Sequence, residues 1–327
     1  MRSLLFRNSI APMLVLVLVV ASATACGGGD NPGDTTDAAI SGDAASGDSY
    51  SLRWGPLTVA PGVEDTRCVT LRLSNATPIK VHRMRNVLES SSHHLIVYRD
   101  NGATQESPTP TPCSPFAGAL DLDGTASPIM ITQRADELLE LPAGVAYSFA
   151  PQQFIRIEMH YINTTDAPIE ASATTEFFTI PEADARFEAD FLFIGSPDID
   201  FTLQPGGTAD LQAYFPVPAS LDGSNYFAIT GHTHHFGTDM NVASAPSAGG
   251  ARTMVYDPSP FSWSEPETVR HDPPFTVPPG GGFDFSCSWR NGEASPVTVQ
   301  FGESANDEMC FFWAYYYPSR GAKVCFH

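Results

Sequence analysis

The stretch Gly231–Gly237, GHTHHFG, places three of the chain's nine histidines within four positions. His232 and His234 are two residues apart, and side chains with that spacing on an extended strand leave the same face. Both imidazoles can then reach one metal ion. His235 points the other way, and we expect it to be a structural hydrogen-bonding partner. An H-x-H pair also occurs by chance on protein surfaces, so it indicates a metal site only together with further ligands.

Three other places supply candidate ligands. His93 and His94 are adjacent, so on a flat strand they would leave opposite faces, and they can share an ion only at a strand end or bulge. His160 lies in an alternating, strand-like segment, where a lone histidine is usually structural. Met309 begins an aromatic run, where it is either core filler or a soft thioether ligand. A thioether suits copper, above all copper(I), and does little for zinc, magnesium or calcium.

The segments that carry these residues are strand-like. Runs of β-branched and aromatic residues are separated by turns, and the chain contains 28 prolines and 26 glycines. Helical periodicity is scarce, and its best candidate, residues 135–144, is short and contains Pro142. Ten or more strands over roughly 275 residues fit two β-sandwich or jelly-roll domains better than one. The polar stretch 181–185 gives the boundary, which predicts domains at 50–183 and 184–327.

The N-terminus predicts export. A basic start and a short apolar run precede the small residues before Cys26, which resemble a bacterial lipobox. We expect a lipoprotein signal peptide at 1–25, with Cys26 acylated, and a flexible tether rich in Gly, Asp, Ser and Ala at 26–49. An ordinary secretory signal cut near Ala25 is the alternative. The predicted location is the cell envelope, anchored by lipid to the outer membrane on its periplasmic or surface face.

Charge and cysteines restrict the partners and the compartment. The formal net charge is −20, which argues against nucleic acid or an anionic membrane surface as a partner and otherwise serves solubility. Contact with a membrane is expected only through the anchor. Six cysteines in an exported chain predict disulfides. If Cys26 carries lipid, one of the remaining cysteines is left over or pairs elsewhere.

The order of the motifs adds specificity. A tandem pair of histidines, a single histidine, H-x-H and a methionine, all in β context, resemble the copper type II, ascorbate-dependent monooxygenases, from about Cys68 to Cys325. That resemblance implies two jelly-roll-like domains with one copper each, facing each other across a solvent-filled cleft. Carried over to this chain, the first copper, which transfers electrons, has the ligands His93, His94 and His160. The second copper, where oxygen reacts, has the ligands His232, His234 and Met309.

The resemblance also implies a reaction. Such an enzyme hydroxylates a C–H bond of a small-molecule substrate with O2, and ascorbate or another one-electron donor supplies two electrons per turnover. Cys287 and Cys310 resemble the disulfide of the family's catalytic domain. Cys325 matches a family position whose usual partner is missing here. Cys68 and Cys113 are a candidate pair within the first domain, although their spacing gives no argument for it.

Two departures bear on the substrate. The peptide-amidating members of the family have an arginine where this chain has Thr230, and an asparagine where it has Phe311. A peptide carboxylate has therefore lost its expected anchors, and we do not expect peptide amidation. The aromatic run 311–317 predicts a cleft for an apolar or aromatic substrate, although alternation turns half of these side chains toward the core. Tyr316 and Tyr317 are candidate substrate contacts, and packing is the plainer interpretation.

Other functions compete with catalysis. A non-catalytic copper-binding or copper-storing envelope lipoprotein would keep the ligands and lack turnover. A structural β-sandwich adhesion module would bind no stoichiometric metal. Zinc hydrolysis is weaker, because no general base stands beside an open zinc site in the sequence pattern.

Overall fold

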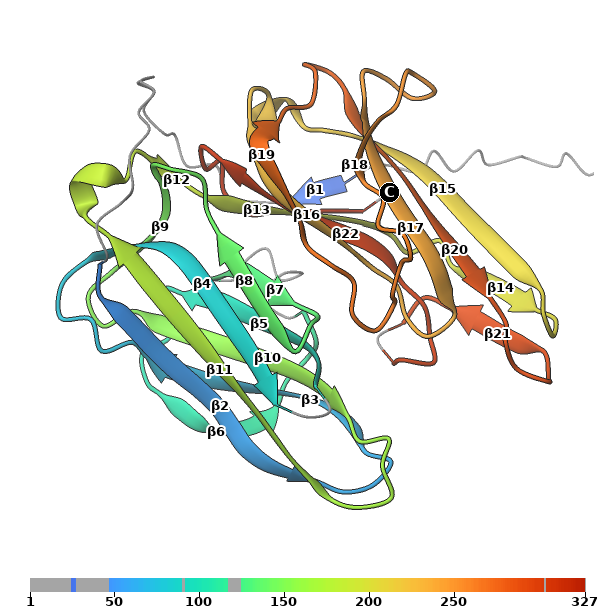
Figure 1. The fold of residues 1–327 in the computed structure, drawn as a ribbon, viewed down its shortest axis with the longest axis horizontal. Helices are drawn as coiled ribbons and strands as arrows, with labels where there is room; N and C mark the ends of the chain where they lie inside the picture. Colours follow the sequence, from blue (N-terminus) through green and yellow to red (C-terminus); the bar gives the residue numbers. More distant parts are fainter. Residues whose placement is uncertain (1–24, 28–46, 90–91, 117–124, 303, 327) are drawn as a thin grey trace, which may run out of the picture.

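The computed structural model describes residues 25–27, 47–89, 92–116, 125–302 and 304–326. These residues form an almost entirely β structure with sandwich-like sheets, which confirms the predicted all-β class. Figure 1 shows two groups of strands, one blue to green and the other mainly yellow to red. We call strands β2 to β12 the N-terminal half, and strands β13 to β23, together with β1, the C-terminal half.

The N-terminal half contains two facing sheets. One has the order β6-β3-β10-β5-β7, and the other has the order β12-β9-β4-β11-β2, with β8 paired to β4. The strands are β2 Ser49–Val59, β3 Glu64–Arg72, β4 Ile79–Glu89, β5 Ser92–Asp100, β6 Ser107–Pro112, β7 Ala126–Thr132, β8 Asp136–Glu140, β9 Val145–Phe149, β10 Phe154–Ile162, β11 Ile169–Ile180 and β12 Phe187–Glu188.

The C-terminal half contains a six-stranded sheet of order β1-β23-β13-β22-β16-β19, a four-stranded sheet of order β15-β20-β17-β18 and the pair β14-β21. The strands are β1 Ala25–Gly27, β13 Asp190–Ser196, β14 Asp200–Leu203, β15 Thr208–Pro216, β16 Asn225–His232, β17 Gly237–Ala245, β18 Thr253–Tyr256, β19 Val269–Phe275, β20 Gly282–Arg290, β21 Val297–Gln300, β22 Cys310–Tyr317 and β23 Lys323–Phe326. Two short 3-10 helices are η1 Glu182–Asp184 and η2 Ala219–Leu221.

Strand β22 is buried on both faces. Phe312, Ala314 and Tyr316 pack into the core of the C-terminal half. Phe311, Trp313 and Tyr315 alternate with them and join the core that fills the N-terminal half. Alternation along one aromatic strand thus ties the two halves together.

The segment 135–144, the best helix candidate in the sequence, is not helical in the structure. Its residues Asp136–Glu140 form β8, which pairs antiparallel with β4. Leu139 is buried and Leu138 is 46% exposed, so the two leucines alternate as on a strand. The backbone partner supplied by β4 overrides a weak helical preference.

The predicted domain boundary falls at η1, and it stays a prediction. Among the described residues, no helix is long and apolar enough to span a membrane.

Both proposed cysteine pairs form disulfides in the structure. Cys68–Cys113 joins β3 to the segment after β6, and Cys287–Cys310 joins β20 to the start of β22. The second bridge therefore links the two larger sheets of the C-terminal half directly beside Met309. Cys325, whose partner the sequence left open, is also disulfide-bonded. In the backbone register of β1 with β23, Cys26 lies opposite Cys325.

Candidate metal centre

The H-x-H motif lies at the end of strand β16. His232 is the last residue of the strand, and His234 lies just beyond it. The rings of His232 and His234 meet at a centroid distance of 4.9 Å, as their spacing on one face predicts. The backbone N–H of His234 donates a hydrogen bond of 2.8 Å to Glu308 Oε2. Both imidazoles are buried, with 1% of each residue exposed.

The tandem histidines lie at a β-bulge. In the pairing of β5 with β10, His94 is opposite His160, Ser92 is opposite Tyr161, and the register shifts between these pairs. His93 is the extra residue, so its ring turns to the side that His94 faces. The ring centroid of His93 is 5.4 Å from that of His94 and 5.3 Å from that of His160.

The five candidate histidine ligands converge. The ligand atoms of His93, His94 and His160 lie within 4.8 Å of one another, and so do those of His93, His232 and His234. The resemblance implies two trios separated by a solvent-filled cleft, whereas here the rings of the two trios lie side by side. The reason is the aromatic face of β22, which packs against the N-terminal half and draws the histidines together.

The pairing of β22 with β16 brings the segment before β22 close to the H-x-H motif. Strand β22 pairs with β16 so that Phe311 is opposite His232. Met309 precedes Phe311 by two residues, just before β22 begins, and His234 follows His232 by two residues, just after β16 ends. Met309 is 2% exposed and belongs to the core cluster shared by the two halves.

Unpartnered nitrogens make the cluster suitable for metal. The buried Nε2 atoms of His93, His94 and His232, and also Nδ1 of His94, have no hydrogen-bond partner. A buried polar atom left without a partner costs about 1–3 kcal/mol, so an ion is the natural partner for this arrangement. Nitrogen donors with one thioether fit copper better than zinc, magnesium or calcium.

Burial also keeps the imidazoles neutral. Desolvation, followed by the neighbouring histidines, lowers the pKa of His93 to about 3. Desolvation lowers the pKa of His234 to about 4 and those of His94 and His232 well below the ordinary value. Metal binding requires the neutral ring, so protons compete weakly for these ligands.

We therefore expect metal affinity to be almost independent of pH between 7.5 and 5.5. An imidazole with an ordinary pKa of about 6.5 loses roughly tenfold in availability at pH 5.5, and three of them would lose about a thousandfold. The lowered pKa values of His93, His232 and His234 predict a change of less than about threefold. Competition titrations of Zn²⁺ at the two pH values measure this, and a fall of a hundredfold or more would contradict it.

Gln133 is a site residue that the sequence did not predict. It follows β7 in the N-terminal half, and its Oε1 accepts a hydrogen bond of 2.5 Å from Nδ1–H of His232. Its Nε2 donates to the carbonyl of Gly231 over 2.9 Å, which fixes the orientation of the amide. The proton of His232 therefore sits on Nδ1 and its Nε2 lone pair faces the cluster.

Replacing Gln133 with leucine should weaken metal binding at the H-x-H motif by about 10–100-fold, the usual cost of losing a group that orients a ligand. Competition with a chromophoric chelator measures the dissociation constant. Gln212→Leu is the matched control, because Gln212 is exposed and bonds to Asp284 away from the cluster. An affinity within twofold of wild type would show that His232 does not depend on this amide.

Glu64 orients His160 in the same manner. Its Oε1 accepts from Nε2–H of His160 over 3.0 Å and from the backbone N–H of Ala305 over 2.9 Å. The hydrogen bond from His160, helped by that from Ala305, outweighs the effect of burial and lowers the pKa of Glu64 to about 2. The carboxylate is thus ionised at neutral pH, and Ala305 belongs to the other half of the molecule. No local pattern marks a contact between residues 241 positions apart.

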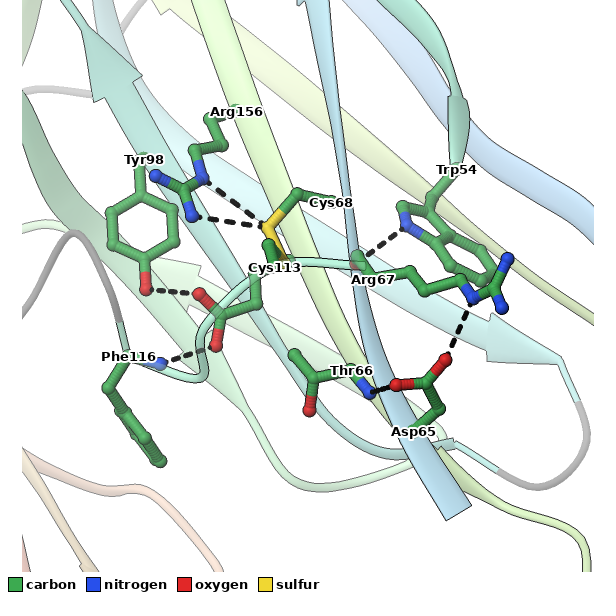
Figure 2. Close-up of a disulfide and its surroundings, with 10 residues drawn as sticks. Trp54, Asp65, Thr66, Arg67, Cys68, Tyr98, Cys113, Phe116 and Arg156 are labelled. Carbon is green, nitrogen blue, oxygen red and sulfur yellow. Dashed lines mark hydrogen bonds and ion pairs between the residues drawn. A yellow bond between two sulfur atoms is a disulfide. The ribbon is translucent and has the colours of Figure 1, made fainter. Parts of the chain in front are cut away.

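Figure 2 shows the Cys68–Cys113 disulfide and the residues around it in the N-terminal half. The guanidinium of Arg156 lies against Cys68 Sγ, with Nη2 at 3.2 Å. Glu158 accepts hydrogen bonds from Tyr98 Oη over 2.8 Å and from the backbone N–H of Phe116 over 2.7 Å. Phe116 has a positive φ of 51°, unusual for phenylalanine, and its ring contacts His94 at 5.2 Å. Burial raises the pKa of Glu158 to about 7.

A groove between the halves reaches the cluster. Its volume is about 410 Å³, within the range of small-molecule sites. The residues that line it are Leu88, Glu89, His93, Gln133, Ala135, Ile162, Thr164, Trp263, Ser264 and Glu265. We call this space the His93 groove.

The aromatic residues predicted to line the cleft do not line the His93 groove. The His93 groove has Trp263 as its aromatic residue, and residues 311–317 are not among its lining. Tyr316 uses its hydroxyl to donate to the carbonyl of Gly321 over 2.6 Å, which is a packing role. His235 is exposed, and its ring contacts Phe236 and Trp263. Thr230, the position of the missing arginine, is buried and faces Gln133.

Comparisons with solved structures give weak likenesses. The major capsid protein P2 from bacteriophage PM2 has a TM-score of 0.33 at 9% identity, over 91% of this chain and 100% of that chain. The top component of cowpea mosaic virus has a TM-score of 0.29 at 9% identity, over 80% of this chain and 90% of that chain. Scores this low carry no argument. A search of curated protein sequences gave no match.

One family model matches the sequence. It describes the C-terminal domain of the copper type II ascorbate-dependent monooxygenases and matches residues 213–327. The matched segment contains His232, His234 and Met309, whereas the N-terminal trio lies outside it. The match supports a relationship between this chain and the copper type II ascorbate-dependent monooxygenase family.

Proposed function

We propose that this protein is a copper-dependent monooxygenase that hydroxylates a C–H bond of a small organic substrate. In the balanced reaction, substrate R–H, O2, two electrons and two protons give R–OH and water. The electrons come from ascorbate or another one-electron donor. The observation that carries the proposal is the convergence of five buried histidines in two overlapping trios.

The roles of the chain's residues follow from their contacts. His93, His94 and His160, together with His232, His234 and Met309, would hold the metal. Copper bound there supplies one-electron redox chemistry and O2 activation. The remaining residues hold the ligands in position: Gln133 fixes the proton of His232 on Nδ1, and Glu64 fixes that of His160 on Nε2.

The His93 groove is the proposed substrate site. Leu88, Ile162 and Trp263 give it apolar walls, and it reaches the cluster at His93. Its lining residues include Glu89 and Glu265 and no lysine or arginine, so the groove favours a substrate without a terminal carboxylate. A small apolar or aromatic molecule matches both features.

A non-catalytic copper-holding role is the second candidate, because all five histidines are less than 9% exposed. Copper-loaded protein, incubated with ascorbate, isotopically labelled O2 and a panel of small organic molecules, separates the two. A monooxygenase incorporates label into a product and consumes O2 in proportion to it. A copper-holding protein retains copper and gives no labelled product with any member of the panel.

We also propose that the protein is exported and anchored by lipid at Cys26. Intact mass analysis of the mature chain from a membrane fraction, before and after reduction, is the measurement. The expected mass begins at residue 26 and carries acyl groups. The thiol of Cys26 can carry lipid or take part in a disulfide, but not both. Because Cys68–Cys113 and Cys287–Cys310 add mass on reduction in either case, the outcome that would contradict the anchor is an unacylated chain in which reduction opens a third disulfide.

A further inference from the structure

We propose that His93, His232 and His234 form one metal site that crosses between the two halves, with His93 as a ligand shared with the N-terminal trio. The proposal uses ligands of the proposed function and rests on it only for the choice of copper as the resident ion. It differs from two independent sites, one in each half, which the sequence resemblance implies.

The geometry favours a shared site. The ring centroid of His93 lies 6.0 Å from that of His232 and 6.0 Å from that of His234. The three ligand atoms lie within 4.8 Å of one another, and each of these residues is at most 8% exposed. A tetrahedral ion with Zn–N distances of about 2.0–2.1 Å needs ligand atoms only about 3.4 Å apart, so small rotations complete the site.

Hydrogen bonds between the two halves hold His93 close to His232 and His234. Gln133 of the N-terminal half holds His232 and Gly231 of the C-terminal half. Glu64 of the N-terminal half holds Ala305, close to Met309 in sequence. These bonds set the distance between the halves without any ion, and they leave Nε2 of His93 and of His232 buried and unpartnered.

The bulge at the start of β5 turns His93 toward both groups of histidines. His94 is opposite His160 and belongs to the N-terminal trio alone. His93, the extra residue, belongs to both trios. Two ions cannot both take the same His93 nitrogen, so the second ion is left with one ligand fewer. We therefore expect one tight ion per chain and a second that binds much more weakly.

Zinc titration of the full-length, metal-free protein tests this, and it requires no turnover. Calorimetry and metal analysis after desalting should give one tight Zn²⁺ for the wild type and for His94→Ala. His93→Ala should lose tight binding by at least about 100-fold, because Zn²⁺ gains little from the thioether of Met309. His235→Ala, which changes an exposed neighbour outside both trios, is the matched control.

The two variants discriminate between the arrangements. Separate sites predict that His93→Ala and His94→Ala behave alike, because each would remove one ligand from the same trio. Equal losses in the two variants, or a tight zinc ion retained by His93→Ala, would overturn the shared site. Circular dichroism of the metal-free variants checks their folding.

Hydrogen exchange on the wild-type protein gives an answer that needs no variant. One equivalent of Zn²⁺ should slow exchange of β5 amides in the N-terminal half and of residues 230–236 in the C-terminal half within the same titration step. Protection confined to one half would overturn the proposal. Because zinc is redox-inactive, a failure here differs from a failure of the oxygenase assay, which requires copper, O2 and a reductant.

Discussion

Replacing Met309 with isoleucine should reduce hydroxylation by at least about 100-fold while the histidines still bind copper. The thioether is the soft donor that favours the reduced ion, and a branched alkyl group offers no lone pair. Loss of a direct ligand should exceed the 10–100-fold cost of losing a group that only orients one. Labelled-product formation and copper content, measured on the same preparation, give the two readouts.

The fold should survive this change, because hydrophobic exchanges of similar volume usually cost less than about 1.5 kcal/mol. Met254→Ile is the matched control, since Met254 is 42% exposed on β18. Activity within threefold of wild type in Met309→Ile would remove Met309 from the reaction and weaken the oxygenase proposal.

Replacing Glu308 with alanine should destabilise the C-terminal half by about 4 kcal/mol. The buried carboxylate accepts hydrogen bonds from the backbone N–H groups of His234 and Phe236 and from Nε1–H of Trp289, at 2.7–2.8 Å. Each buried donor left without an acceptor costs about 1–3 kcal/mol. Urea unfolding of the metal-free protein measures the free energy.

Glu308→Gln keeps one acceptor oxygen and should cost about half as much. Burial raises the pKa of Glu308 to about 7, above its unfolded value, despite its hydrogen bonds. The folded state therefore takes up a proton, and this contribution to stability is present below the unfolded pKa and lost as pH rises through 7. The difference between wild type and Glu308→Gln should shrink between pH 5.5 and 8. Glu293→Ala, at an exposed position, should change stability by less than about 0.5 kcal/mol.

Local rules predicted much of the centre. Alternation placed His232 and His234 on one face, and the need for a bulge at His93 and His94 was met. The all-β class and the pairs Cys68–Cys113 and Cys287–Cys310 also agree with the structure.

What the sequence did not predict depends on how the halves pack. Gln133 reaches His232 over 99 positions and Glu64 reaches His160 over 96, and neither side chain carries a spacing signal. The convergence of the two trios depends on which face of β22 contacts the N-terminal half, and alternation alone leaves that choice open. Residues 136–140 became a strand because β4 offered them a hydrogen-bonding edge.

The double burial of β22 restricts how a reactant can enter. Prying the halves apart would expose Phe311, Trp313 and Tyr315 to water, and aromatic side chains of 150–250 Å² at about 25 cal/mol per Å² make that cost on the order of 10 kcal/mol. A wide opening of the two halves is therefore too costly for this molecule. The His93 groove, with Trp263 in its wall, reaches the cluster without any separation of the halves, so a small molecule can approach His93 while β22 stays buried.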